Sequence, residues 1–239
     1  MRSARIVAWM RLLSEKNKYT SYKTRKVLME KTNWEISYDI HLEKYSQLDP
    51  EETTKRTGIE FDTEQSRFKL ETLGHHLYAE WPNFKLTPKD KETCPKALYD
   101  FGMQVLVMRV LYLGVAAPAS GNFKAYRELP WGDVYDANFN GRCIKRFAFG
   151  FGFKPEKFAE AAEKLSGKKI DGGDIAYEFP FLGGIASRFI LWKPDEEFPP
   201  SAQILFSDNS VLMYNAEDLA AVGDVIISAL KNPVSRDPL

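Results

Sequence analysis

The stretch that decides the fold is FPFLGGIASRFILWKPDEEFPPSAQILFSD, residues 179–208. It holds two apolar segments, residues 185–192 and 202–206, whose length and composition are typical of buried strands. Between them lies the acidic connection Asp195-Glu196-Glu197-Phe198-Pro199-Pro200. Proline fixes its own φ and restricts the residue before it, so the shape of this connection is specified. If the two segments pair as neighbouring strands, Asp208 at the end of the second lies a short distance from this connection in space.

Further strands and helices follow from the flanking sequence. Residues 59–61, 67–72 and 75–81 predict short strands, with Thr72-Leu73-Gly74 as a turn. Helices are predicted over residues 34–48, 49–58, 96–114, 136–149, 155–165 and 215–231. Strands in two blocks separated by helices indicate an α+β fold. We expect a single domain in which two small, mainly antiparallel strand blocks pack with a buried central helix and several surface helices.

Three regions are predicted along the 239 residues: a poorly ordered basic arm at 1–30, the α+β domain at 31–232 and a tail at 233–239. Residues 1–30 carry eight Lys or Arg against two Glu, a net charge of +6, so the remainder carries −6. Two alternatives remain open: residues 1–15 form a helix lying on an anionic membrane surface, or residues 1–28 precede the true initiator, Met29. No secretory signal or membrane span is predicted.

The acidic body disfavours binding of nucleic acid by the folded domain. The only cysteines, Cys94 and Cys143, lie far apart in the sequence. This spacing argues against a disulfide scaffold or a site of paired thiolates and fits a reducing cytoplasm. His75 and His76 are adjacent, so on a strand they would point to opposite faces and could not easily share a metal. No phosphate-binding loop, dinucleotide fingerprint or nucleophile elbow is present.

Two polar clusters are the candidate chemistry. Asp195, Glu197 and Asp208 would supply a general acid and base, or ligands for a hard cation, if the paired strands brought them together. The alternative is a solvated acidic turn. In the second cluster, Tyr126 with Arg127 and Glu128 would anchor an anionic or aromatic ligand, or Arg127 would tie the acidic loop to the helices by an ion pair.

The same clusters carry a resemblance to a known family. The motifs are Ser120-Gly121, Arg127-Glu128-Leu129-Pro130, Trp192-x-x-Asp195-Glu196-Glu197-Phe198-Pro199, Ile204-Leu205-Phe206 before Asp208, and Glu217-Asp218-Leu219. Over residues 35–232 the chain resembles the uncharacterised family called domain of unknown function 3786. The resemblance implies a soluble prokaryotic domain with no assigned activity. It also implies that Arg109 stands where the family often has His, so a function resting on that histidine would be absent. Some relatives carry a cysteine-rich iron–sulfur segment, which this chain lacks.

Three functions are consistent with these residues. The first is binding of a small molecule or cofactor in a cleft between segment 120–130 and loop 195–200, with apolar walls beside a few polar groups. Its candidate ligand-binding residues are Tyr126, Arg127, Glu128, Trp192, Asp195, Glu197 and Asp208. The second is a carboxylate-based or divalent-metal-dependent enzyme. The third is an accessory protein that docks a partner through its acidic face. The sequence leaves the ligand, any cofactor and the oligomeric state open.

Overall fold

The computed structural model describes residues 33–233. The chain divides into two compact units, Met1–Glu43 and Lys44–Leu239, and the second contains both sheets. Helix α2 (Asn33–Ser46) runs across the boundary between the units. The expected arm at 1–30, its membrane-surface alternative and the tail beyond Pro233 lie outside the described residues, and the domain boundaries stay predictions.

The smaller sheet is an antiparallel meander in the order β1-β2-β3-β4. Its strands are β1 (Phe61–Asp62), β2 (Arg67–Thr72), β3 (His75–Glu80) and β4 (Lys85–Pro88). Phe68 and Leu70 are buried, as their alternation with charged residues predicts. Leu73 and Gly74 both have positive φ, the conformation of the tight two-residue hairpin turn. The predicted meander is confirmed, and β4 extends it.

The larger sheet is also antiparallel, in the order β5-β9-β8-β7-β6. It consists of β5 (Phe123–Ala125), β6 (Lys168–Ile170), β7 (Ile175–Phe181), β8 (Ile185–Trp192) and β9 (Ser201–Ser207). Strands β8 and β9 pair from Ser187 with Phe206 to Trp192 with Ser201, so the two apolar segments flanking the acidic connection are neighbouring strands. Strand β5 adds to the free edge of β9.

The helices largely follow the predicted segments. They are α3 (Pro50–Thr57), α4 (Phe101–Leu113), α5 (Gly132–Phe139), α6 (Arg146–Phe151), α7 (Pro155–Lys164), α8 (Ser210–Met213) and α9 (Ala216–Lys231). Short turns η1 (Lys96–Leu98), η2 (Tyr126–Glu128) and η4 (Leu182–Gly184) are 3₁₀, and η3 (Asn140–Lys145) is a π-helical stretch that joins α5 to α6.

The predicted helix caps are confirmed. The Asp49 carboxylate accepts hydrogen bonds at the start of α3, and Gly58 ends that helix in the left-handed conformation. Asn215 and Asp218 form a reciprocal capping box at the start of α9. The predicted helix at 96–114 is instead η1 followed by α4, because the Asp100 side chain caps a new start at Phe101.

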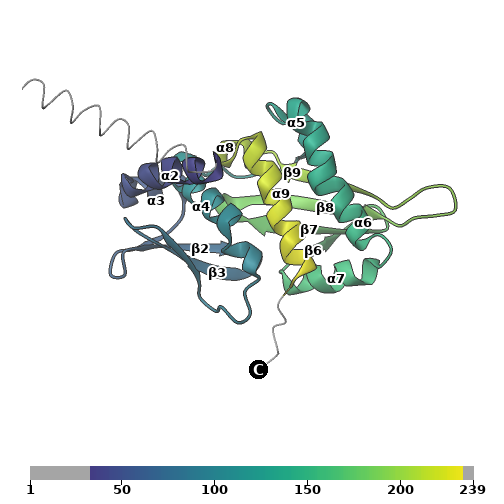
Figure 1. Cartoon of the computed structure of the whole chain (residues 1–239), viewed down its shortest axis with the longest axis horizontal. Helices are drawn as coiled ribbons and strands as arrows, with labels where there is room; N and C mark the ends of the chain where they lie inside the picture. Colours follow the sequence, from purple (N-terminus) through teal and green to yellow (C-terminus); the bar gives the residue numbers. More distant parts are fainter. Residues whose placement is uncertain (1–32, 234–239) are drawn as a thin grey trace, which may run out of the picture. The chain divides into compact units, whose positions relative to one another are not determined.

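The core of the larger sheet lies under its helices. Figure 1 shows α9, α5, α6 and α7 over one face of β6–β9. Phe147 of α6 and Phe158 of α7 meet edge to face, with ring centroids 4.9 Å apart, and Phe147 meets Phe189 of β8 at 5.2 Å. Helix α4 is buried along much of its length, as predicted for the central helix. The architecture is that of an α+β domain.

Candidate functional site

A cleft of about 800 Å³ opens beside the smaller sheet. Its floor is the end of the β2–β3 hairpin, with Lys69, Glu71 and His76. Its walls are residues 57–60 at the C-terminal end of α3, residues 116–119 after α4, and η4. Segments from both sheets and two helices therefore meet at one concave surface.

The loop after α4 is tied to α3 by Arg56. The Arg56 guanidinium donates to the carbonyl oxygen of Leu111 at 2.7 Å and to that of Gly114, so it satisfies carbonyls at the C-terminal end of α4. In return, the Ala116 amide donates to the Arg56 carbonyl at 2.8 Å. A larger residue at position 114 would clash with the neighbouring structure, because a Cβ there would lie 2.7 Å from the Met213 sulfur. This wall has a fixed position.

Asp208 and Asn209 hold the same loop from the side of the larger sheet. Asp208 accepts from the Ser120 amide at 3.1 Å and from the Ser120 hydroxyl. These hydrogen bonds, led by the one from the hydroxyl, hold the pKa of Asp208 below its ordinary value. The Asn209 side-chain amide donates to the carbonyls of Ala117 at 2.9 Å and Gly184 at 3.1 Å. Asp208, a predicted ligand-binding residue, therefore positions the segment next to the cleft.

The floor of the cleft carries an ion pair and a separate polar pair. The Lys69 ammonium lies 2.7 Å from Glu60 and 3.7 Å from Asp62. Glu71 stands directly opposite His76 in the β2–β3 register. His76 is exposed whereas the adjacent His75 is buried, so the two histidines point to opposite faces, as expected. Among the described residues there is no group of three or more His, Cys, Asp or Glu that could hold a metal ion.

The acidic connection 195–200 forms a turn of its own. The Asp195 carboxylate accepts from the backbone amides of Glu197 at 2.9 Å and Phe198 at 2.7 Å, the geometry of an Asx turn. Pro200 is buried against Gly152, where an added Cβ would lie 2.2 Å from the Pro200 Cβ. Glu197 is exposed, and Trp192 is 38% exposed. The loop's shape is thus explained by local hydrogen bonds and packing.

Strand pairing keeps Asp208 away from this turn. The turn precedes Ser201 at one end of β9, whereas Asp208 follows Ser207 at the other. A strand of seven residues spans roughly 20 Å. Asp195 and Glu197 therefore do not meet Asp208 around one point, as an enzyme built on all three carboxylates would require.

The second predicted cluster is largely structural. The Tyr126 ring is buried and stacked on Phe139 at 4.0 Å, and its hydroxyl donates to the Ala216 carbonyl at 2.8 Å. Burial raises the pKa of Tyr126 to about 12. Glu128 accepts from the Ala125 amide at 2.6 Å. Arg127 is exposed, and within the described residues it makes no ion pair with loop 195–200. A cleft between segment 120–130 and that loop stays a prediction.

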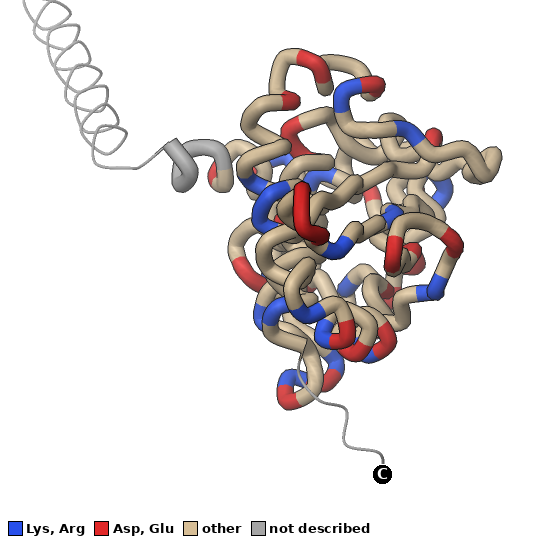
Figure 2. Tube along the Cα trace, turned by 90° about the vertical axis from the view of Figure 1, so that its right-hand side faces the viewer, with Lys and Arg blue, Asp and Glu red and all other residues tan. Residues whose placement is uncertain are grey.

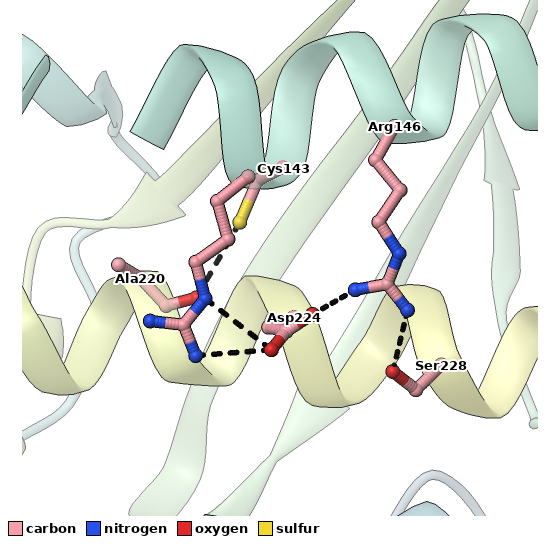
Figure 3. A network of polar contacts seen from close by, with 6 residues as sticks. Cys143, Arg146, Ala220, Asp224 and Ser228 are labelled. Carbon is pink, nitrogen blue, oxygen red and sulfur yellow. Dashed lines mark hydrogen bonds and ion pairs between the residues drawn. The ribbon is translucent and has the colours of Figure 1, made fainter. Parts of the chain in front are cut away.

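A network between η3–α6 and α9 was not predicted (Figure 3). Asp224 accepts from Arg142 Nη2 at 2.9 Å and from Arg146, whose other terminal nitrogen donates to the Ser228 hydroxyl at 2.8 Å. Nearby, the buried Cys143 thiol lies 3.4 Å from the Ala220 carbonyl oxygen. The four-residue spacing of both Arg142–Arg146 and Asp224–Ser228 places each pair on one helix face. This spacing was the sequence feature from which the network could have been predicted. The network joins two helices and leaves its carboxylate fully engaged.

Arg109 also has a structural partner. Its Nε donates to Asp218 Oδ2 at 2.8 Å, which links α4 to the first turn of α9 in a largely buried position. The same oxygen accepts from the Asn215 amide at 3.1 Å. Desolvation raises the pKa of Asp218 although Arg109 opposes the shift. Arg109 therefore serves the packing of two helices.

Both cysteines are free and buried, and burial raises the pKa of Cys94 to about 11 and that of Cys143 to about 12. These thiols are protonated at neutral pH and are poor nucleophiles.

Across residues 33–233, no helix is long and apolar enough to cross a membrane. Basic and acidic residues are interspersed along the trace in Figure 2. The expectation about nucleic acid stays a prediction.

Comparison with known proteins gives one result. Searches of curated proteins and of solved structures found no match. A family model matches residues 49–229, which include both sheets, the cleft and the helices from α3 to most of α9. The chain belongs to this family, which is described as "Domain of unknown function (DUF3786)".

Proposed function

We propose that the protein binds a small molecule in the cleft lined by residues 57–60, 69–71, 116–119 and η4. The observation that carries the proposal is the cleft itself, because its volume of about 800 Å³ lies within the roughly 300–1,000 Å³ of small-molecule sites. Its lining combines alanine and proline side chains with a few charged groups, which is the composition of such sites.

Preorganisation of the walls supports the proposal. Arg56, Asn209 and Asp208 fix the loop 114–120 from two sides by hydrogen bonds. A ligand entering a preformed cleft does not lose binding free energy to the ordering of the loop. The three anchoring residues come from α3 and from the end of β9, so a helix and the larger sheet both support the wall.

The proposal also keeps two expectations from the sequence, an alternative location of the site and a location of the protein in the cell. A site between segment 120–130 and loop 195–200 is the alternative location, with Arg127, Glu197 and Trp192 as its exposed candidates. A reducing cytoplasm is the proposed location of the protein, supported by the two free thiols.

Native mass spectrometry of the purified full chain tests the proposal. We expect a co-purifying small molecule that is lost in Ala119→Trp, because Ala119 lines the cleft and is exposed, so an indole there occupies ligand volume without disturbing the core. The matched control is Ala137→Trp, at an exposed position on α5 outside the cleft, which should retain the molecule. Retention in Ala119→Trp with loss in Arg127→Ala or Glu197→Gln would move the site to the alternative location.

A further inference from the structure

We infer that the ligand of this cleft is an organic cation, a compound with an apolar body and a protonated amine that Glu71 binds beside His76. This inference rests on the proposed function and names the chemical class of its ligand. It comes from the charges on the floor of the cleft and from which of them already have partners.

The single lysine of the lining is already neutralised. Lys69 lies 2.7 Å from Glu60 and 3.7 Å from Asp62, so its charge faces two carboxylates. An anionic ligand would have to compete with both acids for this one ammonium. The lining residues Glu60, Glu71 and Lys69 together carry a net charge of −1 when His76 is neutral. The electrostatic preference of the cleft is therefore for a cation.

Glu71 is the carboxylate that remains available. Within the described residues its side chain has neither a hydrogen bond nor an ion pair, and it is exposed at the cleft. A carboxylate of this kind is an acceptor for an ammonium group, and a charge-assisted hydrogen bond is roughly twice as strong as a neutral one.

His76 adds a second acceptor to the same point. Glu71 and His76 are direct cross-strand partners, which places their Cβ atoms about 5 Å apart on one face of the sheet. A neutral imidazole has one acceptor nitrogen, and an ammonium has three donors. One primary amine can therefore donate to both side chains, whereas a quaternary ammonium can donate to neither.

The walls select the rest of the molecule. Ala116, Pro118 and Ala119 present apolar side chains to the cleft and are exposed. Residues 116–119 carry no charge, so the ligand's second end would meet apolar surface rather than a counter-ion. These features favour an amine with an apolar substituent over a polyamine.

Titration of the ¹⁵N-labelled full chain with three matched probes tests the inference. The probes are 2-phenylethylamine, the neutral 2-phenylethanol and the anionic 3-phenylpropanoate, which share an apolar body. We expect the amine to shift the amide signals of Glu71, His76 and Ala117 and to bind more tightly than the other two. Glu71→Gln should weaken amine binding by about tenfold or more, the effect of losing one charge-assisted hydrogen bond.

Glu64→Gln is the matched control, because Glu64 is an exposed acid in the β1–β2 turn outside the cleft lining. It should change amine affinity less than about twofold, the scale of a screened surface charge. Equal affinity for the amine and the alcohol, an unchanged affinity in Glu71→Gln, or no shift at the cleft amides would each overturn the cation inference. Such results leave the proposed function standing if Ala119→Trp still releases the co-purifying molecule, so the two can fail separately.

Discussion

The carboxylate of Asp208 anchors the loop next to the cleft. It is a carboxylate at the surface that accepts two hydrogen bonds from Ser120 and thereby fixes the chain next to the cleft wall. Sequence reasoning chose it because it is an acid at the end of a strand. In the structure its partner comes from 88 positions earlier in the chain, and no local pattern indicates such a contact.

The stability contributed by Asp208 should depend on pH. Its folded pKa lies below the ordinary value of 3.8, so the carboxylate stabilises the fold at pH values above the unfolded pKa. That stabilisation disappears as the pH falls through the lower, folded pKa. Asp208→Ala should therefore be less stable than the wild type at pH 7, and the difference should close at pH values below 3.8.

Urea unfolding at a series of pH values measures this difference. Ser120→Ala, which removes one of the two donors, should show a smaller difference over the same pH range. A difference between wild type and Asp208→Ala that stays constant down to pH 3 would show that the carboxylate charge has no part in anchoring the loop.

At the scale of elements, the buried helix α4 reaches α9 through one ion pair. Arg109 and Asp218 have side chains only 18% and 9% exposed, and Asp218 also belongs to the capping box of α9. The charge of Arg109 is therefore a requirement of helix packing. The resemblance that places histidine at this position in relatives does not make the arginine a ligand-binding group here.

Arg109→Met should be strongly destabilising. It leaves the Asp218 carboxylate buried and without its cation, a change that costs about 3 kcal/mol at buried pairs. Arg142→Met is the matched control: the Arg142 side chain is 43% exposed and its partner Asp224 keeps Arg146, so a loss below about 1 kcal/mol is expected. Chemical denaturation of both variants measures the free energies of unfolding. Equal losses would contradict the assignment.

At the scale of the whole molecule, the two sheets of the unit Lys44–Leu239 are connected by direct contacts. The Leu73 amide at the tip of the β2–β3 hairpin donates to the Pro180 carbonyl of β7 at 3.4 Å. The cleft also brings both sheets together, because its lining includes residues 69–71 of β2 and η4, which connects β7 to β8.

We therefore expect both sheets to unfold in one cooperative step. Native-state hydrogen exchange should give the slowest amides of β2, such as Leu70, the same opening free energy as those of β8, such as Phe189, because each opens only by global unfolding. Both residues are essentially fully buried. Exchange at Leu70 with a markedly lower opening free energy would show that the meander opens as a separate unit and that the cleft floor is not fixed to its walls.

Much of the fold could be predicted because its signals are local. Alternation at Phe68 and Leu70, the caps at Asp49 and Asn215, and the proline-bounded connection each depend on neighbours within a few residues. Strand β5 was missed because three residues are too short for a pattern, and they become a strand only by pairing with β9. The network at Asp224 could not be predicted, because the four-residue spacing of Arg142 and Arg146 indicates an ion pair only once their helix is known to face α9.

The candidate cleft likewise depends partly on local sequence signals and partly on contacts between distant segments. By itself, the sequence determined an α+β domain, the two apolar strand segments that are β8 and β9, and the rigid acidic turn between them, since strand composition and proline geometry act locally. Only the tertiary structure decided that Asp208 lies at the far end of β9 from that turn and that Glu71 and His76 share a cleft with residues 116–119. The physical reason is that a cleft is a property of surfaces brought together by folding, and these surfaces come from segments distant in the sequence.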